Sequence, residues 1–244
     1  GNLKIISKYG IGLDKIDLEA TKKYGVKVYN TPGVNHIAVA EHILALIFSY
    51  FKNIHLEYSF TKRGLWNRMI GNEIFSKKVG VLGLGRIGKE ISTRLLSLGL
   101  DVIVFDKYID FDFVRKHKIN VANNLKDLIS KLDILVLTLP LNNETQGIIT
   151  PNLISNNNQP LVLVNTSRAN LIKLEDLISM LDKKIISAYL TDVMDIEPMP
   201  KTHPLTKYEN VLITPHIGSR TYETVERQGL AAVNNLIDGL NNNF

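Results

Sequence analysis

The sequence predicts an α/β protein built around a doubly wound parallel sheet, with helices covering both faces. Short apolar runs, of the kind that form strands buried on both faces, alternate with helix-like or loop stretches along most of the 244 residues. A glycine-rich turn at 83–88 follows one of these runs and opens a helix-like stretch. The next apolar run ends at an acidic residue, Asp106. Strand, turn, helix, strand and acid in this order are typical of a nucleotide-binding unit.

The composition is that of a packed protein with a mild preference for anions. Hydrophobic residues make up 45% and charged residues 22%, which is ample for a core. The net charge of +5 and the pI near 9.2 favour anionic ligands, but no basic run is interleaved with aromatic residues. We therefore expect small anionic molecules and no nucleic acid. The lack of cysteine excludes thiol chemistry and cysteine-ligated metals, and the cytoplasm is the default location.

The sequence predicts neither membrane insertion nor secretion. The apolar stretch 37–50 is interrupted by Glu41 and His42 and is too short to span a bilayer. No leader with a basic and then an apolar part opens the chain. The chain starts with Gly1, directly before the strand-like run Leu3–Ser7, so we expect that a preceding segment is missing.

The first residues predict part of a second α/β domain, flavodoxin-like in fold. A short helix begins near Asp17 and ends at Gly25, a strand covers 26–29, and a long helix covers about 35–53. A last helix at about 221–239 follows the complete sheet. The expected division is 1–53 for the partial substrate domain and the long connecting helix, 54–73 for an interface or hinge segment, 74–218 for the Rossmann domain that binds the nucleotide, and 219–244 for a C-terminal helix that returns to the substrate domain.

The glycines of the turn have separate expected roles. A strand-like run at 78–82 precedes them and a helix-like stretch at 87–98 follows. Gly83 permits the tight turn, Gly85 lets the backbone approach a pyrophosphate, and Gly88 lets the helix pack closely against the strand. The N-terminus of the helix then presents its N–H groups to the anion.

Asp106 is the expected partner of the adenosine ribose. A carboxylate at this place accepts hydrogen bonds from the two ribose hydroxyls and repels a 2′-phosphate, which favours NAD over NADP. The adjacent Lys107 weakens that preference. The alternative is a plain strand-to-helix turn followed by a solvated aspartate, which the combined context of strand, helix and acid disfavours.

Three polar side chains of the kinds that catalysis uses follow later apolar runs, at the edge where a parallel sheet binds its ligand. The runs are 134–137, 161–164, 185–190 and 211–213. Arg168 can bind a carboxylate through two hydrogen bonds, and His216 suits proton transfer because imidazole titrates near neutral pH. Glu197 could pair with His216 and hold it protonated. The structural alternatives are a surface arginine, a structural histidine and a solvated glutamate.

The other histidines lack such a position. His42 lies on the apolar long helix, so we expect a packing role for it. No His/Glu spacing resembles a metal site.

Together these runs resemble the D-isomer-specific 2-hydroxyacid dehydrogenase family over nearly the whole chain. The residues that carry the resemblance are Lys8–Asp14, Asn30–Gly33, Ala38–His42, Gly83–Gly88, Leu139–Leu141 with Thr145, Asn165–Arg168, Asp192, Glu197–Pro198 and Thr214–Gly218. The resemblance implies hydride transfer between NAD and a D-2-hydroxy acid. That chemistry requires a base for the hydroxyl proton, a role that His216 fits.

The resemblance also implies roles for individual residues. Arg168 would bind the substrate carboxylate and carbonyl, His216 would be the acid/base, Glu197 would tune it, and Asp192 would orient the nicotinamide amide. The implied cofactor contacts are Gly83, Gly85, Arg86, Ile87, Gly88, Asp106, Leu139, Pro140, Thr145, Thr166, Ser167, Asp192, His216 and Gly218. The implied substrate contacts are Arg168, Arg68 and the backbone N–H groups of Tyr9, Gly10 and Ile11.

Two departures from the family are visible. Ala169 stands where members usually have glycine, which would be strained if the backbone there needs a positive φ. The family also has a further α/β segment before the position of Leu3, which supplies part of the substrate cleft.

The substrate is suggested by the run 64–74. Its tryptophan, Trp66, with an arginine two residues later looks most like phosphoglycerate dehydrogenases of serine biosynthesis, so Arg68 would bind phosphate across a homodimer interface. The alternative is that both side chains only pack at an interface or hinge. Other candidate functions are a glyoxylate/hydroxypyruvate or D-lactate reductase, an NADH-sensing corepressor without turnover, and an inactive fragment.

Overall fold

The computed structural model describes residues 2–241, which divide into two compact units. Unit 1 comprises the described residues of Gly1–Ala38 and Ser219–Phe244, and unit 2 is Val39–Gly218. Residues 1 and 242–244, at the ends of the predicted ranges 1–53 and 219–244, lie outside the described part. The roles given to the four predicted ranges stay predictions.

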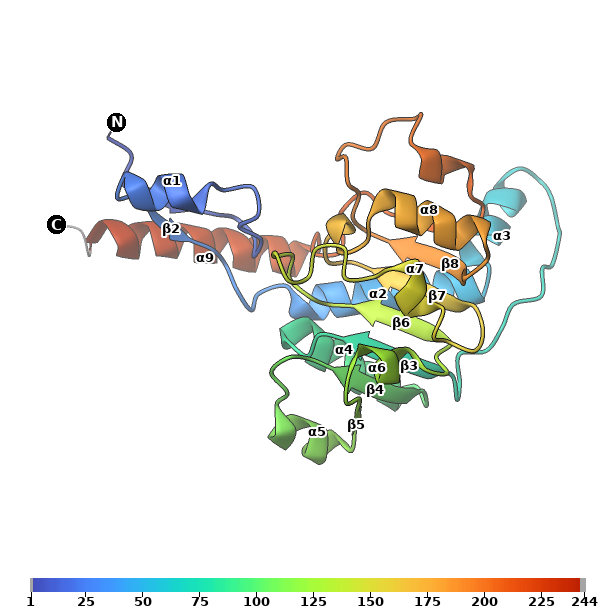
Figure 1. Ribbon diagram of the computed structural model, residues 1–244. Helices are drawn as coiled ribbons and strands as arrows, with labels where there is room; N and C mark the ends of the chain where they lie inside the picture. The colour runs from blue at the N-terminus through green and yellow to red at the C-terminus, as the bar shows by residue number, and fades with distance from the viewer. Residues whose placement is uncertain (1, 242–244) are drawn as a thin grey trace. The chain divides into compact units, whose positions relative to one another are not determined.

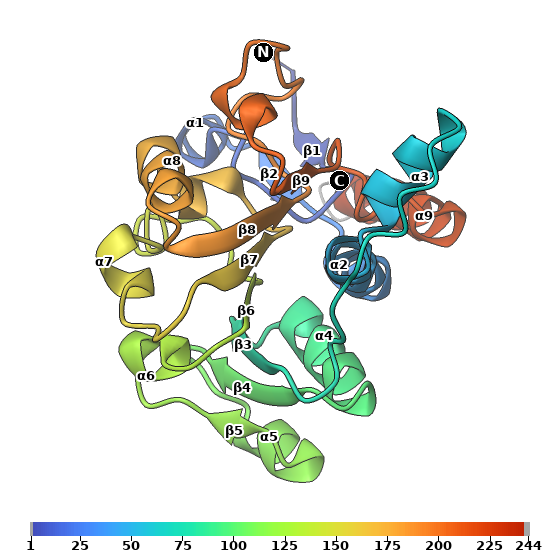
Figure 2. The ribbon, with the colours of Figure 1, turned by 90° about the vertical axis from the view of Figure 1, so that its right-hand side faces the viewer.

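Unit 2 contains a seven-stranded sheet with the order β5-β4-β3-β6-β7-β8-β9, in which all neighbours are parallel (Figures 1 and 2). The strands are β3 (Lys78–Leu82), β4 (Asp101–Phe105), β5 (Asn120–Val121), β6 (Ile134–Leu137), β7 (Leu161–Asn165), β8 (Ile186–Thr191) and β9 (Val211–Ile213). From β3 the chain adds β4 and β5 on one side and then returns to add β6 on the other. This reversal between β3 and β6 confirms the predicted doubly wound sheet and creates the switch point where such sheets bind ligands.

Helices cover both faces of the sheet, and successive side chains of each strand point to opposite faces. The helices are α2 (His36–Phe51), α3 (Ile54–Lys62), α4 (Arg86–Ser97), α5 (Phe111–His117), α6 (Leu125–Ile129), α7 (Pro151–Ile154) and α8 (Leu174–Asp182), with 3-10 turns η1 (Ala169–Leu171) and η2 (Pro204–Lys207). Val79 and Val81 share a core with α2 and α4, whereas Leu82 packs with α6, α7 and α8 on the opposite face (Figure 2). Burying strands on both faces explains their continuous apolar sequences.

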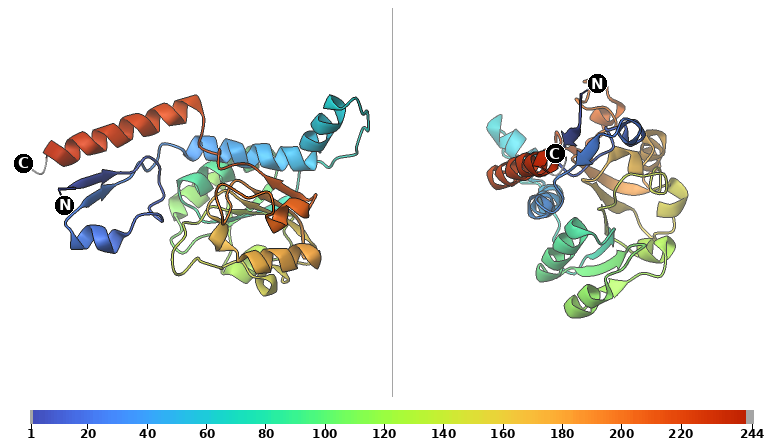
Figure 3. Two further views of the ribbon diagram at one scale, coloured as in Figure 1. Left: turned by 90° about the horizontal axis from the view of Figure 1, so that it is seen from above. Right: turned by 90° about the vertical axis from the view of Figure 1, so that its left-hand side faces the viewer.

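Unit 1 contains the two parallel strands β1 (Ile5–Ser7) and β2 (Lys27–Tyr29) with the helices α1 (Leu18–Lys23) and α9 (Tyr222–Asn241). The left view of Figure 3 shows α9 along one side of the strands and α1 on the other. Asp17 caps α1 by accepting a hydrogen bond from the N–H of Ala20 at 2.8 Å. Ser7 Oγ donates to the carbonyl of Ala232 at 2.6 Å, which ties α9 to β1.

Within residues 2–241, no single helix is long and apolar enough to cross a bilayer. In this described part, α2 and α3 taken together meet the length and composition required, but a bend of 66° separates them.

Candidate cofactor and catalytic site

The glycine turn between β3 and α4 has the geometry of a phosphate cradle. Gly83 has φ of 102°, a conformation that favours glycine. A Cβ on Gly88 would lie 2.1 Å from the carbonyl oxygen of Gly83, so only glycine allows α4 to approach the turn this closely. A Cβ on Gly85 would meet nothing within 4 Å, which leaves open space above this residue. The first turn of α4 carries no acidic residue, so its positive dipole end is available to an anion.

Asp106 follows β4 and connects directly to this turn. Its Oδ2 accepts a hydrogen bond from the N–H of Leu84 at 2.5 Å, and its Oδ1 accepts one from the N–H of Tyr108 at 2.8 Å. These two bonds fix the carboxylate beside the glycines, where the ribose is expected.

Lys107 is held by a glutamate of the loop after β6. Its Nζ lies 2.9 Å from Glu144 Oε2, and this hydrogen bond raises the pKa of Lys107. Together with Tyr108, Asn142 and Asn143, the pair lines an open pocket at this edge of the sheet. Because Glu144 offsets the lysine charge, Lys107 weakens the preference for NAD less than the sequence alone suggests.

Replacing Asp106 by alanine should change cofactor choice. The variant loses the carboxylate that would accept the ribose hydroxyls, so we expect the Kd for NADH to rise about 10-fold, the equivalent of about 1.4 kcal/mol. The Kd for NADPH should rise less, because the charge that repels a 2′-phosphate is gone as well. Fluorescence titration with both cofactors measures the ratio, and Asp112→Ala, an exposed acid on α5, is the matched control. An unchanged NADH/NADPH ratio would exclude Asp106 as the ribose partner.

The loops after β6 and β7 supply the other predicted cofactor residues. Leu139 and Pro140 follow β6, and the hydroxyl of Thr145 closes their loop by donating to the carbonyl of Pro140 at 2.6 Å. Ser167 Oγ donates to the carbonyl of Leu137 at 3.0 Å. Thr166 Oγ1 is buried, and no described residue forms a hydrogen bond with it. A buried hydroxyl in this state indicates a group that binds here.

Arg168 is positioned by a buried asparagine that sequence reasoning did not single out. Asn165, the last residue of β7, donates through Nδ2 to the carbonyl of Arg168 at 2.9 Å and accepts from the N–H of Ser167 at 3.1 Å. Its side chain therefore fixes the turn from which Arg168 extends. The sequence feature that could have indicated this role is the amide of Asn165 directly after the apolar run 161–164. Ala169 is the first residue of η1, a right-handed turn that alanine adopts without strain.

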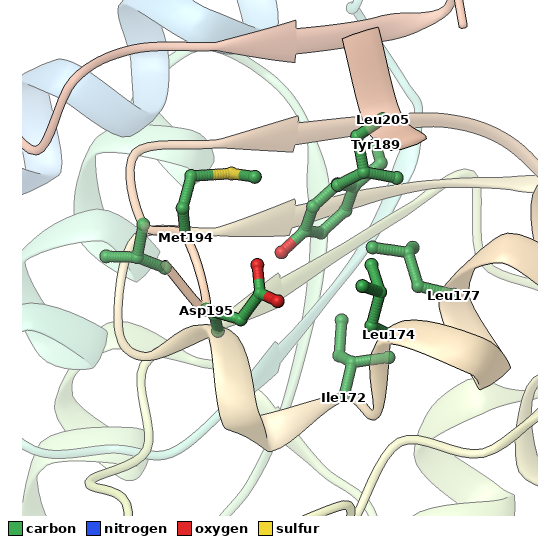
Figure 4. A pocket seen from close by; sticks show the side chains of 9 residues that line it. Ile172, Leu174, Leu177, Tyr189, Met194, Asp195 and Leu205 are labelled. Atoms are coloured by element: carbon green, nitrogen blue, oxygen red, sulfur yellow. The ribbon is translucent and has the colours of Figure 1, made fainter. Parts of the chain in front are cut away.

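A small cavity lies behind this turn. Its volume is about 20 Å³, enough for roughly one water molecule and far below the several hundred Å³ of ligand pockets. Figure 4 shows the hydroxyl of Tyr189 and the carboxylate of Asp195 facing the same space between apolar side chains. Asp195 also accepts a hydrogen bond from His203 Nε2 at 2.9 Å. The cavity thus belongs to the framework that holds the loop after β8.

His216 and Glu197 form a pair, as the sequence suggested. His216 Nδ1 lies 2.9 Å from Oε2 and 3.1 Å from Oε1 of Glu197, so Nδ1–H donates to the carboxylate. Glu197 is held in turn by the N–H of Met194, which donates to Oε1 at 3.0 Å. The side chain of His216 is 47% exposed and that of Glu197 29% exposed. The imidazole is therefore oriented by a fixed carboxylate and still open to a reactant.

Both oxygens of the Asp192 carboxylate accept hydrogen bonds. Burial raises its pKa, but hydrogen bonds from His42, Thr214 and the N–H groups of Ile217 and Gly218 outweigh burial, and the pKa lies below its usual range. The sequence had suggested a packing role for His42. The structure shows that its Nε2 lies 2.8 Å from Thr214 Oγ1 and 3.4 Å from Asp192 Oδ1.

The predicted substrate residues belong to both units. Tyr9, Gly10 and Ile11 follow β1 in unit 1, and the N–H of Gly10 donates to Thr31 Oγ1 at 3.0 Å. This N–H would therefore have to exchange its partner to bind a substrate. Arg168 belongs to unit 2, as does Arg68, which is exposed in the segment after α3.

This edge of unit 2 fits a dinucleotide. Four features lie at the carboxyl ends of β3, β4 and β7 in one parallel sheet: the open space above Gly85, the uncompensated N-terminus of α4, the fixed carboxylate of Asp106 and the Thr166 hydroxyl. For a metal ion, residues 2–241 contain no group of three or more His, Asp or Glu side chains that could hold one.

Comparison with known proteins agrees with this geometry. Residues 44–218 match the family model of the D-isomer specific 2-hydroxyacid dehydrogenase, NAD binding domain. A glyoxylate reductase of Thermofilum pendens is 34% identical over 242 residues, which cover 97% of this chain and 71% of that protein. A D-3-phosphoglycerate dehydrogenase of Bacillus subtilis is 33% identical over 224 residues, which cover 91% of this chain and 42% of that protein.

Solved structures show the same likeness. The 2-hydroxyacid dehydrogenase of Ketogulonicigenium vulgare Y25 superposes with a TM-score of 0.87 at 30% identity, over 99% of this chain and 76% of that chain. The chain thus spans less than half of the phosphoglycerate dehydrogenase and about seven tenths of the glyoxylate reductase. It belongs to the D-isomer specific 2-hydroxyacid dehydrogenases, a family of NAD-dependent oxidoreductases, and residues 44–218 are its NAD binding domain.

Proposed function

We propose that this chain carries the cofactor-binding and catalytic part of a dehydrogenase that interconverts a D-2-hydroxy acid and a 2-oxo acid. The observation that carries the proposal is the His216–Glu197 pair at the same sheet edge as the glycine turn. An oriented, half-exposed imidazole beside a nicotinamide site is what alcohol oxidation requires, because the hydroxyl must lose its proton.

The residues divide the chemistry between them. The turn Gly83–Gly88 and Asp106 would hold NAD, which would supply a hydride acceptor for the carbon that bears the hydroxyl. Nδ1–H of His216 donates to Glu197, so Nε2 is the ring nitrogen that takes the hydroxyl proton in oxidation and returns it to the carbonyl oxygen in reduction. Glu197 stabilises the imidazolium that forms. Arg168 binds the substrate carboxylate through its two-pronged guanidinium and holds the reacting carbon in place.

For the substrate we propose 3-phosphoglycerate and its oxo acid, 3-phosphohydroxypyruvate. Support comes from Arg68, an exposed cation near Trp66, and from the similarity to the Bacillus subtilis phosphoglycerate dehydrogenase. The similar identity of the Thermofilum pendens enzyme keeps glyoxylate as the competing substrate. An arginine can bind a phosphate that glyoxylate lacks, so the two proposals differ in what Arg68 does.

A panel of 2-oxo acids tests both the proposed dehydrogenase activity and the proposed substrate. NADH oxidation by the full protein is measured with 3-phosphohydroxypyruvate, hydroxypyruvate, glyoxylate, pyruvate and 2-oxoglutarate. We expect 3-phosphohydroxypyruvate to give the highest kcat/KM. We also expect Arg68→Ala to raise its KM about 10-fold or more and to change glyoxylate kinetics less than about twofold, since only one substrate offers a phosphate. Equal effects on both would assign Arg68 to packing. NADH binding without turnover on any acid would favour a cofactor-sensing protein.

We also propose a homodimer through the segment around α3. Seven large apolar side chains between Ile54 and Phe75 lie exposed, including Trp66 at 80% and Ile70 at 95% exposure. The others are Ile54, Tyr58, Leu65, Met69 and Phe75. Exposed apolar clusters of this kind are typical of protein interfaces. The cytoplasmic location stays a prediction from the sequence.

A further inference from the structure

The turn that carries His216 has an unusual backbone, and one carboxylate holds it. His216 has φ of 55°, a left-handed backbone conformation that residues other than glycine seldom adopt. The two N–H groups that follow both donate to Asp192, from Ile217 to Oδ1 at 2.8 Å and from Gly218 to Oδ2 at 2.7 Å. Successive N–H groups after a left-handed residue form a concave anion site, and here its anion is a side chain of the protein.

Asp192 is in turn fixed by Thr214 and His42. The hydroxyl of Thr214 lies 2.6 Å from Asp192 Oδ1, a length typical of a bond to a charged acceptor, so its single proton points to the carboxylate. Thr214 Oγ1 is then the acceptor for His42, whose Nε2 carries the proton and lies 2.8 Å from this hydroxyl and 3.4 Å from Asp192 Oδ1. His42 lies on α2, whose neighbouring Ile43 is fully buried in the core. A relay of hydrogen bonds therefore runs from a packed helix to the turn of His216.

Gly218 permits this arrangement. A Cβ at this position would lie 2.9 Å from Asp192 Oδ2 and 3.5 Å from Cδ2 of His42. The turn and the carboxylate are thus in direct contact, and a displacement of Asp192 would displace the two N–H groups that follow His216.

We propose that His42 and Thr214 are positioning residues for the acid/base His216. They act by holding Asp192, which closes the left-handed turn that carries His216. This inference rests on the proposed function for its kinetic consequence. Its geometric consequence, a fixed environment of the His216 ring, is independent of turnover.

The experiment uses the full protein with the variants His42→Leu, His42→Gln and Thr214→Val. Leucine removes the donor at similar volume, whereas the glutamine amide can still donate to Thr214. We expect His42→Leu and Thr214→Val to lower kcat about 10- to 100-fold, as a misplacement near 1 Å does, with the Kd for NADH within about threefold. Glutamine should restore most of the activity. Because both residues serve one relay, the double variant should be no slower than the slower single variant.

Two controls separate the outcomes. His117→Leu, on α5, should keep the wild-type kcat. In protein labelled with 15N-histidine, the ring signals of His216, assigned with His216→Ala, should shift in His42→Leu and return in His42→Gln.

Unchanged ring signals, or a loss of NADH binding equal to the loss of kcat without rescue by glutamine, would overturn the inference. A wild-type protein that turns over none of the acids would refute the proposed function, and the ring signals would still decide the positioning role.

Discussion

Replacing His216 by alanine lowers kcat for the preferred 2-oxo acid by about 10²- to 10⁴-fold, the contribution typical of positioned proton transfer. The Kd for NADH stays within about threefold, because cofactor binding does not need the imidazole proton. The side chain is half exposed, so its removal leaves little empty space in the protein. Stopped-flow reduction of the oxo acid, with NADH titration in parallel, gives both quantities.

The neighbouring variants should differ in kind from His216→Ala. Glu197→Gln keeps an oxygen that can accept from Nδ1 but loses the charge, so we expect an intermediate loss of kcat and a changed pH profile. Arg168→Ala would remove the proposed clamp on the substrate carboxylate, so its main effect should be a higher KM. If His216→Ala lost NADH affinity and kcat in the same proportion, the residue would serve cofactor binding, and another base would have to be sought.

The sheet was readable from the sequence because its strands are buried on both faces. The prediction for 211–213 coincides with β9, and the run 161–164 is one residue shorter than β7. Burial on two faces demands continuous apolar residues, and these stand out from the helices between them. The edge strand β5 has two residues, Asn120 and Val121, of which the first is exposed. Such a strand has no apolar run, so no sequence pattern could indicate it.

The chemistry of the site was readable at strand ends and much less so beyond them. His216 and Glu197 were paired because both follow parallel strands, whose carboxyl ends share one edge. His42 was missed as a bonding partner because it is 172 residues away from Thr214, on a mostly apolar helix. Lys107 and Glu144 are likewise 37 residues apart. Contacts between distant side chains follow from the fold, and no local spacing reveals them.

The second large effect concerns two glycines of the turn. Alanine at Gly88 should destabilise the protein, whereas alanine at Gly85 should impair cofactor binding. Alanine at 88 would gain up to about 1 kcal/mol of helix propensity. Its Cβ would however lie 2.1 Å from the carbonyl oxygen of Gly83, a backbone atom that cannot move aside cheaply. This overpacking against the backbone outweighs the gain in helix propensity, and we expect a loss of about 3 kcal/mol in the free energy of unfolding. At 2–4 °C per kcal/mol, Tm falls by roughly 6–12 °C, which calorimetry detects.

Gly85→Ala should leave the protein folded and still impair the cofactor site. The added methyl group meets no protein atom within 4 Å, and φ of −69° with ψ of −166° suits alanine. Loss of the glycine N-cap costs at most about 1 kcal/mol. The methyl group would instead occupy the space into which a pyrophosphate must come, so the Kd for NADH should rise more than about 10-fold while Tm changes by less than about 3 °C. If Gly85→Ala bound NADH normally, the pyrophosphate would have to lie elsewhere. The contrast between the two variants separates the glycine that packs the protein from the glycine that admits the ligand.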